Sequence, residues 1–104
     1  MGIDVSWVTE GRESKQQVFD PRQHLTKLAN ESWCHQANSV CLRFIDPWGN
    51  TVFNQAQLPV LLAEFQGAVA QQVDAEVKAH LGKVIRLLEQ ASGRTHTYIE
   101  FTGD

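Results

Sequence analysis

The hydrophobic residues of this chain recur with two different periods, and this change of period constrains the fold most strongly. In residues 2–9, Ile3, Val5 and Trp7 alternate with polar residues, which is the pattern of a half-buried strand. In residues 59–92, apolar residues recur at every third or fourth position, as they do along amphipathic helices. We therefore expect strands and helices to pack together around one core.

Cap residues indicate where the first helix begins. Asp20 followed by Pro21 predicts a helix over about 21–35, because aspartate is a good N-cap and proline suits the first helical position. Residues 16–19, just before this signal, are a candidate short strand.

Two more helical segments follow in the second half of the chain. Asn54 and Gln57 have the spacing of a capping box, and the helical pattern covers residues 59–72 and 73–92. Gly93 is a typical C-terminal stop. The sequence leaves open whether these two segments are separate helices.

Residues 39–46 are the clearest predicted strand. Alternation divides its side chains between two faces, with Val40, Leu42 and Phe44 on one and Cys41, Arg43 and Ile45 on the other. Residues 51–53 predict a short returning strand, so the two segments are expected to form a β-hairpin.

The turn of this predicted hairpin has the sequence Asp-Pro-Trp-Gly-Asn. We expect Asp46 to accept hydrogen bonds from amides of the turn, Pro47 to fix its first bend and Gly49 to take the left-handed conformation. Trp48 and Asn50 have no structural task in this scheme, so they are candidate contact residues. For Trp48, folding back onto the sheet is favoured over an exposed contact.

The last predicted strand, residues 94–102, offers a second candidate surface. Ile99 and Phe101 are expected to face the helices, while His96, Tyr98 and Glu100 lie on the opposite face, with Arg43 as a cross-strand neighbour of Glu100. A partner surface is favoured for this face over a solvated surface or a catalytic cleft. The complete candidate interface is Arg43, Trp48, Asn50, His96, Tyr98 and Glu100.

The expected elements pack economically as one domain over residues 1–104. A chain of this length can build a core without metal or disulfide staples, and 42% hydrophobic with 20% charged residues is a globular composition. The predicted fold is α+β: a small, mostly antiparallel sheet of three to four strands with two to three helices packed on one face.

Charge and hydropathy exclude several classes of function. The formal net charge is −3 and the Lys and Arg residues are scattered, which argues against a nucleic-acid or anionic membrane surface. No apolar run approaches the roughly 20 residues that cross a bilayer. The N-terminal residues do not have the pattern of a signal peptide, so we expect a cytoplasmic protein with reduced thiols.

The reactive residue types do not form a recognisable catalytic or metal motif. The chain has 4 His and 2 Cys but no Cys-x-x-Cys or His-x-x-x-His pair, and Cys34 with His35 is the only local hint. Glycine-rich phosphate loops are also missing from the sequence. We expect buried thiols, surface imidazoles, no catalytic residues, no metal and no cofactor.

Two segments carry a resemblance to a known group of proteins. Residues 43–54 contain Asp-Pro-Trp-Gly-Asn-Thr-Val-Phe-Asn, and residues 97–104 end in Tyr-Ile-Glu-Phe-Thr-Gly-Asp. They resemble small bacterial proteins of unassigned activity that are encoded on mobile elements, including integron gene cassettes, and near toxin–immunity loci. The resemblance covers residues 40–66 and 94–104, and its motifs are structural.

This resemblance implies a compact α+β domain that acts by binding. We expect a non-enzymatic binding protein of immunity-type or accessory role, forming a homodimer and binding a toxin or another protein. The alternative is a small-molecule-binding protein or small enzyme with a pocket between sheet and helices.

Overall fold

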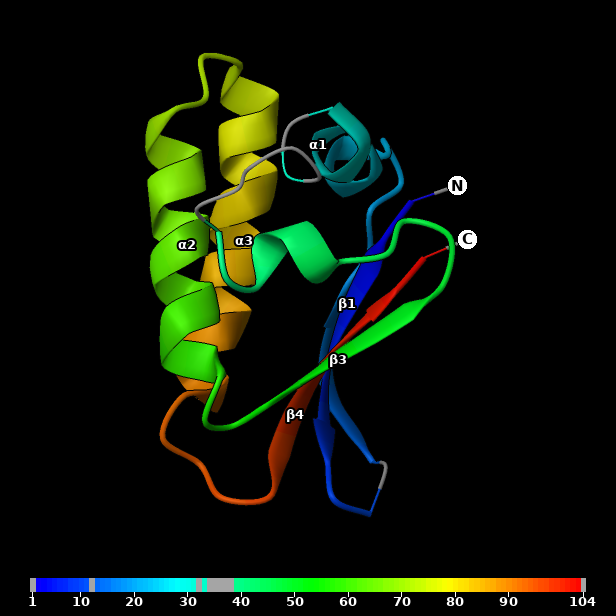
Figure 1. Cartoon of the computed structure of the whole chain (residues 1–104), viewed down its shortest axis with the longest axis vertical. Coiled ribbons are helices and arrows are strands. Elements are labelled where there is room, and N and C mark those ends of the chain that lie inside the picture. The colour runs from blue at the N-terminus through cyan, green and yellow to red at the C-terminus, as the bar shows by residue number, and fades with distance from the viewer. Residues whose placement is uncertain (1, 12, 32, 34–38, 104) are drawn as a thin grey trace.

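The chain forms a two-layer α+β domain in a computed structural model that describes residues 2–11, 13–31, 33 and 39–103 (Figure 1). The elements, in chain order, are β1 (Asp4–Thr9), β2 (Ser14–Val18), α1 (His24–Glu31), the 3₁₀ helix η2 (Leu42–Phe44), β3 (Asn50–Asn54), α2 (Leu58–Ala70), α3 (Ala75–Ala91) and β4 (Thr97–Thr102).

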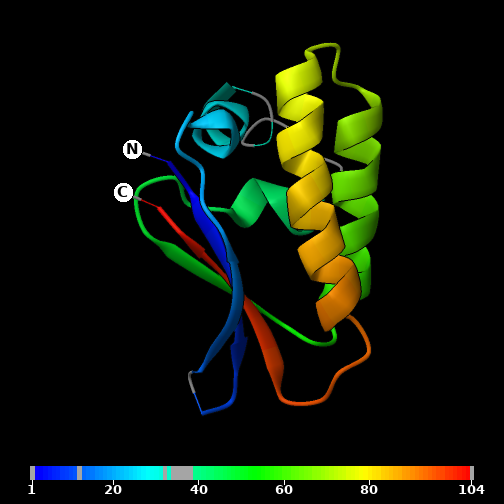
Figure 2. The ribbon, with the colours of Figure 1, turned by 180° about the vertical axis from the view of Figure 1, so that it is seen from behind.

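The four strands form one antiparallel sheet in the order β2-β1-β4-β3. The C-terminal strand β4 therefore lies between β1 and β3. Val5 is opposite Phe101, and Ile99 lies between Trp7 and Phe53, so these side chains share one face. Figures 1 and 2 show that the helices cover only this face of the sheet. The predicted fold class is confirmed.

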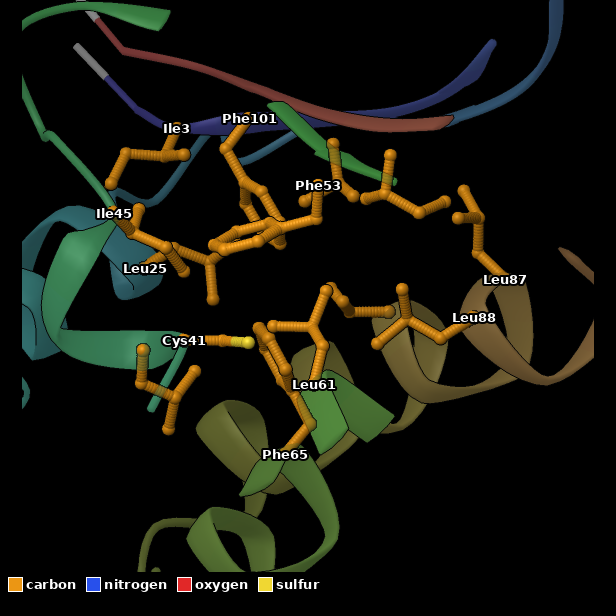
Figure 3. Packing of buried hydrophobic residues seen from close by; sticks show 14 of the residues in the cluster. Ile3, Leu25, Cys41, Ile45, Phe53, Leu61, Phe65, Leu87, Leu88 and Phe101 are labelled. Atoms are coloured by element: carbon orange, nitrogen blue, oxygen red, sulfur yellow. The ribbon is translucent and has the colours of Figure 1, made fainter. Parts of the chain in front are cut away.

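The core lies between this sheet face and the helices (Figure 3). Phe101 of β4 is in contact with two other rings: it stacks on Phe65 of α2 with centroids 6.0 Å apart, and it meets Phe53 edge-on at 5.7 Å. Leu61 and Leu88 extend the same cluster from α2 and α3. Each such side chain stabilises the fold by about 1.5–3 kcal/mol when fully buried.

The predicted strand over 39–46 is wrong. Cys41, Leu42 and Ile45 are buried, whereas Val40 and Phe44 are about 60% exposed, so the buried positions follow a helical turn and not an alternation. The cause is a tertiary contact, because one oxygen of the Glu64 carboxylate, on α2, accepts the backbone N–H groups of residues 41 and 42 at 2.9 and 3.0 Å.

The predicted β-hairpin is therefore also wrong, since β3 pairs with β4 instead. The turn before β3 does form. Asp46 Oδ1 accepts the Trp48 N–H at 2.9 Å, as predicted. The prediction that Gly49 is left-handed is wrong. A Cβ at this position would lie 2.8 Å from Asp46 Oδ2, so the Asp46 side chain would have to shift.

The helices begin at the predicted signals with small shifts. The side chains of Asn54 and Gln57 exchange hydrogen bonds with each other's backbone N–H, which confirms the capping box, and α2 starts at the next residue. A break at residues 71–74 separates α2 from α3, and α3 ends before Gly93, which has φ +82°. None of the described helices is both long enough and apolar enough to span a bilayer.

The first helix differs most from its prediction. It starts at His24 and not at Pro21, which lies in the preceding turn. Asp20 nevertheless accepts hydrogen bonds from the backbone of the first helical turn, as an N-cap does. The last residues of the predicted helix, 34 and 35, lie outside the described residues.

Candidate functional site

A concave surface lies between the edge strand β2 and helix α3. This β2–α3 groove has a volume of about 630 Å³. One wall is formed by residues 16–18 of β2 and by the turn that leads into α1. The other wall is formed by α3, and the lining residues of this helix are Glu76, Ala79, His80, Lys83, Arg86, Leu87 and Gln90.

The groove is basic although the chain as a whole is acidic. Arg22, Lys83 and Arg86 contribute cationic side chains to its lining, and Glu76 is the single carboxylate among the lining residues. Glu76 is itself shared between Arg22 and His24, each with a nitrogen 3.5 Å from Oε1. The groove therefore has net positive charge in a chain whose formal net charge is −3.

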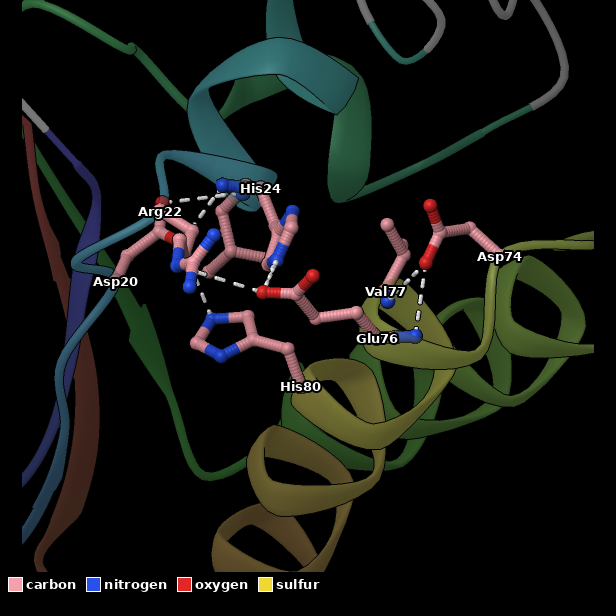
Figure 4. Close-up of polar contacts among 8 residues, drawn as sticks. Asp20, Arg22, His24, Asp74, Glu76, Val77 and His80 are labelled. Carbon is pink, nitrogen blue, oxygen red and sulfur yellow. Dashed lines mark hydrogen bonds and ion pairs between the residues drawn. The ribbon is translucent and has the colours of Figure 1, made fainter.

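A fully buried carboxylate lies behind the groove. Asp20 has 2% of its surface exposed, and its two oxygens accept three backbone N–H groups. Oδ2 accepts those of Ile3 and Leu25 at 3.0 Å, and Oδ1 accepts that of His24 at 2.8 Å. Asp20 thus joins the start of β1 to the start of α1. Figure 4 shows Asp20 beside His24 and His80.

Two imidazoles lie between Asp20 and the groove. The rings of His24 and His80 have centroids 5.6 Å apart. His80 Nε2 lies 3.3 Å from Asp20 Oδ1, but the geometry of this contact is not that of a hydrogen bond. Within the described part of the chain, Nε2 of neither ring has a hydrogen-bond partner, and both atoms are buried. Such atoms are rare in folded proteins.

Burial sets the protonation of His80. Desolvation lowers its pKa below the ordinary 6.5, and the nearby His24 and Lys83 lower it further, while the carboxylate of Asp20 acts in the opposite direction. His80 is therefore a neutral imidazole at pH 7. The prediction that the histidines lie at the surface is wrong for His80, which is buried.

The sequence did hold a signal for His80. It lies three residues after Val77 and four before Val84, within the apolar stripe of α3, so helical geometry directs it inward. No comparable signal joins it to Asp20 and His24, because these residues are brought together only by the packing of α3 beside α1.

The predicted interface residues lie in three different places, not at this groove. Tyr98 and Glu100 are on the sheet face that no helix covers, where Val8 and Val52 are cross-strand neighbours. These four side chains surround a hollow of about 230 Å³. His96 lies in the turn before β4, with Nδ1 2.5 Å from Glu10 Oε2.

The remaining three predicted residues lie before or at the start of β3. Arg43 is in η2, with its guanidinium 4.9 Å from the centre of the Phe44 ring, so the predicted cross-strand placement opposite Glu100 is wrong. Trp48 is 71% exposed, and the prediction that it folds back onto the sheet is wrong. Asn50 begins β3 and is exposed.

The described residues contain neither a reactive cysteine nor a metal-binding site. Cys41 is a buried free cysteine whose pKa is raised by desolvation and by the Glu64 carboxylate, which disfavours the reactive thiolate. No three His, Cys, Asp or Glu side chains of the described chain are arranged to hold a metal ion. Cys34 and His35 lie outside the described residues.

The chain was also compared with protein-family models, with curated proteins and with solved structures, and none of the three comparisons finds a match.

Proposed function

We propose that this chain is a non-enzymatic binding protein that recognises an acidic ligand in the β2–α3 groove. The observation that carries the proposal is the segregation of charge: Arg22, Lys83 and Arg86 gather on one concave surface of an acidic chain. A concave surface with charge of one sign raises the local concentration of ligands of opposite charge and speeds their association.

The two imidazoles suit the same ligand. A neutral imidazole carries one N–H donor, and hydrogen bonds from protein donors to a carboxylate are stronger than those between neutral groups. The Nε2 atoms of His24 and His80 are both buried beside the cationic residues, and neither makes a hydrogen bond among the described residues, although each lies within 3.5 Å of a carboxylate oxygen. An anionic group entering the groove would meet these atoms and the cations together.

Binding is favoured over catalysis by the chemistry of the lining. The described lining residues include no Ser, Thr or Cys to act as a nucleophile. The Asp20 carboxylate is occupied by three backbone N–H groups, so it is poorly placed to accept a proton from a substrate. A small-molecule binder or small enzyme that uses the same groove remains the alternative proposal.

The test is the binding of a probe of defined charge. A fluorescently labelled hexapeptide of alternating glutamate and threonine is titrated with the protein at 50 mM salt, beside its lysine–threonine counterpart. The acidic peptide is expected to bind at least tenfold more tightly, and its affinity is expected to fall as salt is raised. Equal affinity of the two peptides, or no binding of either, would refute the proposal.

A matched pair of variants locates the binding site. Lys83→Gln with Arg86→Gln removes two groove charges and is expected to weaken binding at least tenfold. Lys78→Gln removes an exposed charge from the same helix outside the groove lining and is expected to change affinity less than twofold. Equal effects of the two changes would place the binding site elsewhere.

Self-association is a second proposal, and it rests on the uncovered sheet face. Val52 there is 49% exposed and borders the hollow beside Tyr98. Two copies joined at this face would form the homodimer expected from the sequence. Light scattering after size exclusion is expected to give twice the 11.7 kDa chain mass, and Val52→Glu to give the monomer mass. A strict monomer at high concentration would contradict this proposal.

An immunity-type or accessory role, which the sequence resemblance implies, is the biological setting that we propose for such a protein. The mildly acidic chain would suit a basic toxin, whereas the groove favours an acidic segment of a partner. A pull-down followed by identification of the bound protein, together with the neighbouring genes, distinguishes the two.

A further inference from the structure

Strand β2 lies at one edge of the sheet. Within the described residues β1 is its only strand partner, and residues 14–17 are exposed. In an antiparallel pair, alternate residues direct their N–H and C=O groups away from the partner strand. The outer side of β2 therefore offers a row of backbone groups to an added strand, and the strand contains no proline that would prevent such pairing.

The β2–α3 groove runs beside this free edge. Its α3 wall extends from Glu76 to Gln90, which corresponds to about 21 Å along a helix that rises 1.5 Å per residue. An extended peptide of six residues is about 20 Å long. The length of the groove thus matches a strand of the same size as those in the sheet.

The register of β2 shows which side chains of an added strand would enter the groove. Gln16 is opposite Trp7 and Val18 is opposite Val5, so both point to the helix side of the sheet. Alternate residues of a neighbouring strand would share that side. There they would lie beside α3, whose Lys83 and Arg86 line the groove.

We infer that the ligand is an extended acidic peptide segment of another protein, which pairs with β2 as a fifth strand and directs alternate Asp or Glu side chains toward Lys83 and Arg86. This inference rests on the proposed function, because it specifies the acidic ligand of the same groove. Strand addition of this kind takes affinity from main-chain hydrogen bonds and specificity from alternate side chains. A second copy of the chain is a poorer occupant, since pairing of two β2 strands would bring two basic grooves together.

The test compares peptides that differ only in their backbone hydrogen bonding. The glutamate–threonine hexapeptide is prepared with backbone N-methyl groups on the glutamates, or alternatively on the threonines. All three peptides carry the same charge. A strand pairs along one edge only, so one methylated peptide is expected to bind at least tenfold more weakly than the parent and the other within about threefold of it.

Amide hydrogen exchange supplies the second readout. Outward-facing amides within residues 14–18 are expected to exchange at least tenfold more slowly when the parent peptide is bound, and this protection is expected to disappear in the Lys83→Gln, Arg86→Gln variant.

The possible failures are distinguishable. If both methylated peptides bind like the parent and β2 gains no protection, strand addition is wrong while the acidic-ligand proposal stands. If the parent peptide does not bind, both are wrong. If β2 becomes protected with rising protein concentration and no peptide, a second copy occupies the edge and the inference is overturned.

Discussion

Replacing Asp20 by Asn tests whether the buried carboxylate organises the groove and the fold around it. The substitution conserves size but exchanges one acceptor oxygen for an NH₂ donor. If the NH₂ group replaces Oδ2, two backbone N–H groups, those of Ile3 and Leu25, lose their acceptor. If it replaces Oδ1, only the His24 N–H loses its acceptor.

The second orientation is less costly, so it determines how much the free energy of unfolding is expected to fall. Hydrogen bonds to charged groups contribute about 1.5–3 kcal/mol each, and a buried donor without an acceptor costs about 1–3 kcal/mol. Asp20→Asn loses one such bond and the charge that strengthens the other two, so we expect the free energy of unfolding to fall by about 2–3 kcal/mol. Asp20→Ala loses all three bonds and should cost about 4 kcal/mol or more.

Urea unfolding monitored by tryptophan fluorescence measures these changes in the free energy of unfolding. The slope of this free energy against urea concentration should remain unchanged. In a domain of this size, Asp20→Asn should lower the Tm by about 10–20 °C. Asp74→Asn is the matched control: Asp74 caps α3 at an exposed site, and Asn is an equally good N-cap, so its effect should stay within about 0.5 kcal/mol. If Asp20→Asn costs no more than Asp74→Asn, the organising role of Asp20 is refuted.

Three further predictions concern single side chains. The pKa of His80 is lower in the folded chain than its ordinary 6.5, so the unfolded chain takes up the proton first as the pH falls. The free energy of unfolding should therefore be constant above about pH 7.5 and fall as the pH drops below about 6.5. Urea titrations should show a shallower fall for His80→Gln. In a Cys34→Ser variant, Cys41 should react with a thiol reagent only as fast as the protein unfolds; rapid labelling would contradict its burial and raised pKa. Trp48→Ala should change the free energy of unfolding by less than about 0.5 kcal/mol, since the side chain is 71% exposed, and a loss above about 1 kcal/mol would show that it packs.

Local sequence patterns predicted the elements that are specified by residues close together in the sequence. The alternation of Ile3, Val5 and Trp7 predicted β1, and the capping box at Asn54 and Gln57 predicted the start of α2. In each case, the residues that specify the element are within a few positions of one another. The two-layer α+β class follows from such elements, because helices and a one-sided sheet must bury their apolar sides together.

The segment over 39–46 shows where this reasoning fails. Its β-branched and aromatic residues favour a strand, but the Glu64 carboxylate binds its backbone N–H groups from more than 20 positions away and fixes a 3₁₀ turn. An acceptor contributed by another helix leaves no local pattern. The pairing partner of β3 changes as a consequence, from a neighbouring segment to the C-terminal strand.

The groove could not be predicted from the sequence, because its residues are distant in the sequence and are brought together only by tertiary packing. Arg22 precedes α1, whereas Lys83 and Arg86 lie on α3, and only the packing of these elements gathers their charge beside the edge of β2. A scattered distribution of cations along the sequence therefore does not argue for a scattered distribution in space. It leaves open a short basic groove such as the one between β2 and α3. The α3 wall of this groove, from Glu76 to Gln90, is about as long as one extended strand of six residues.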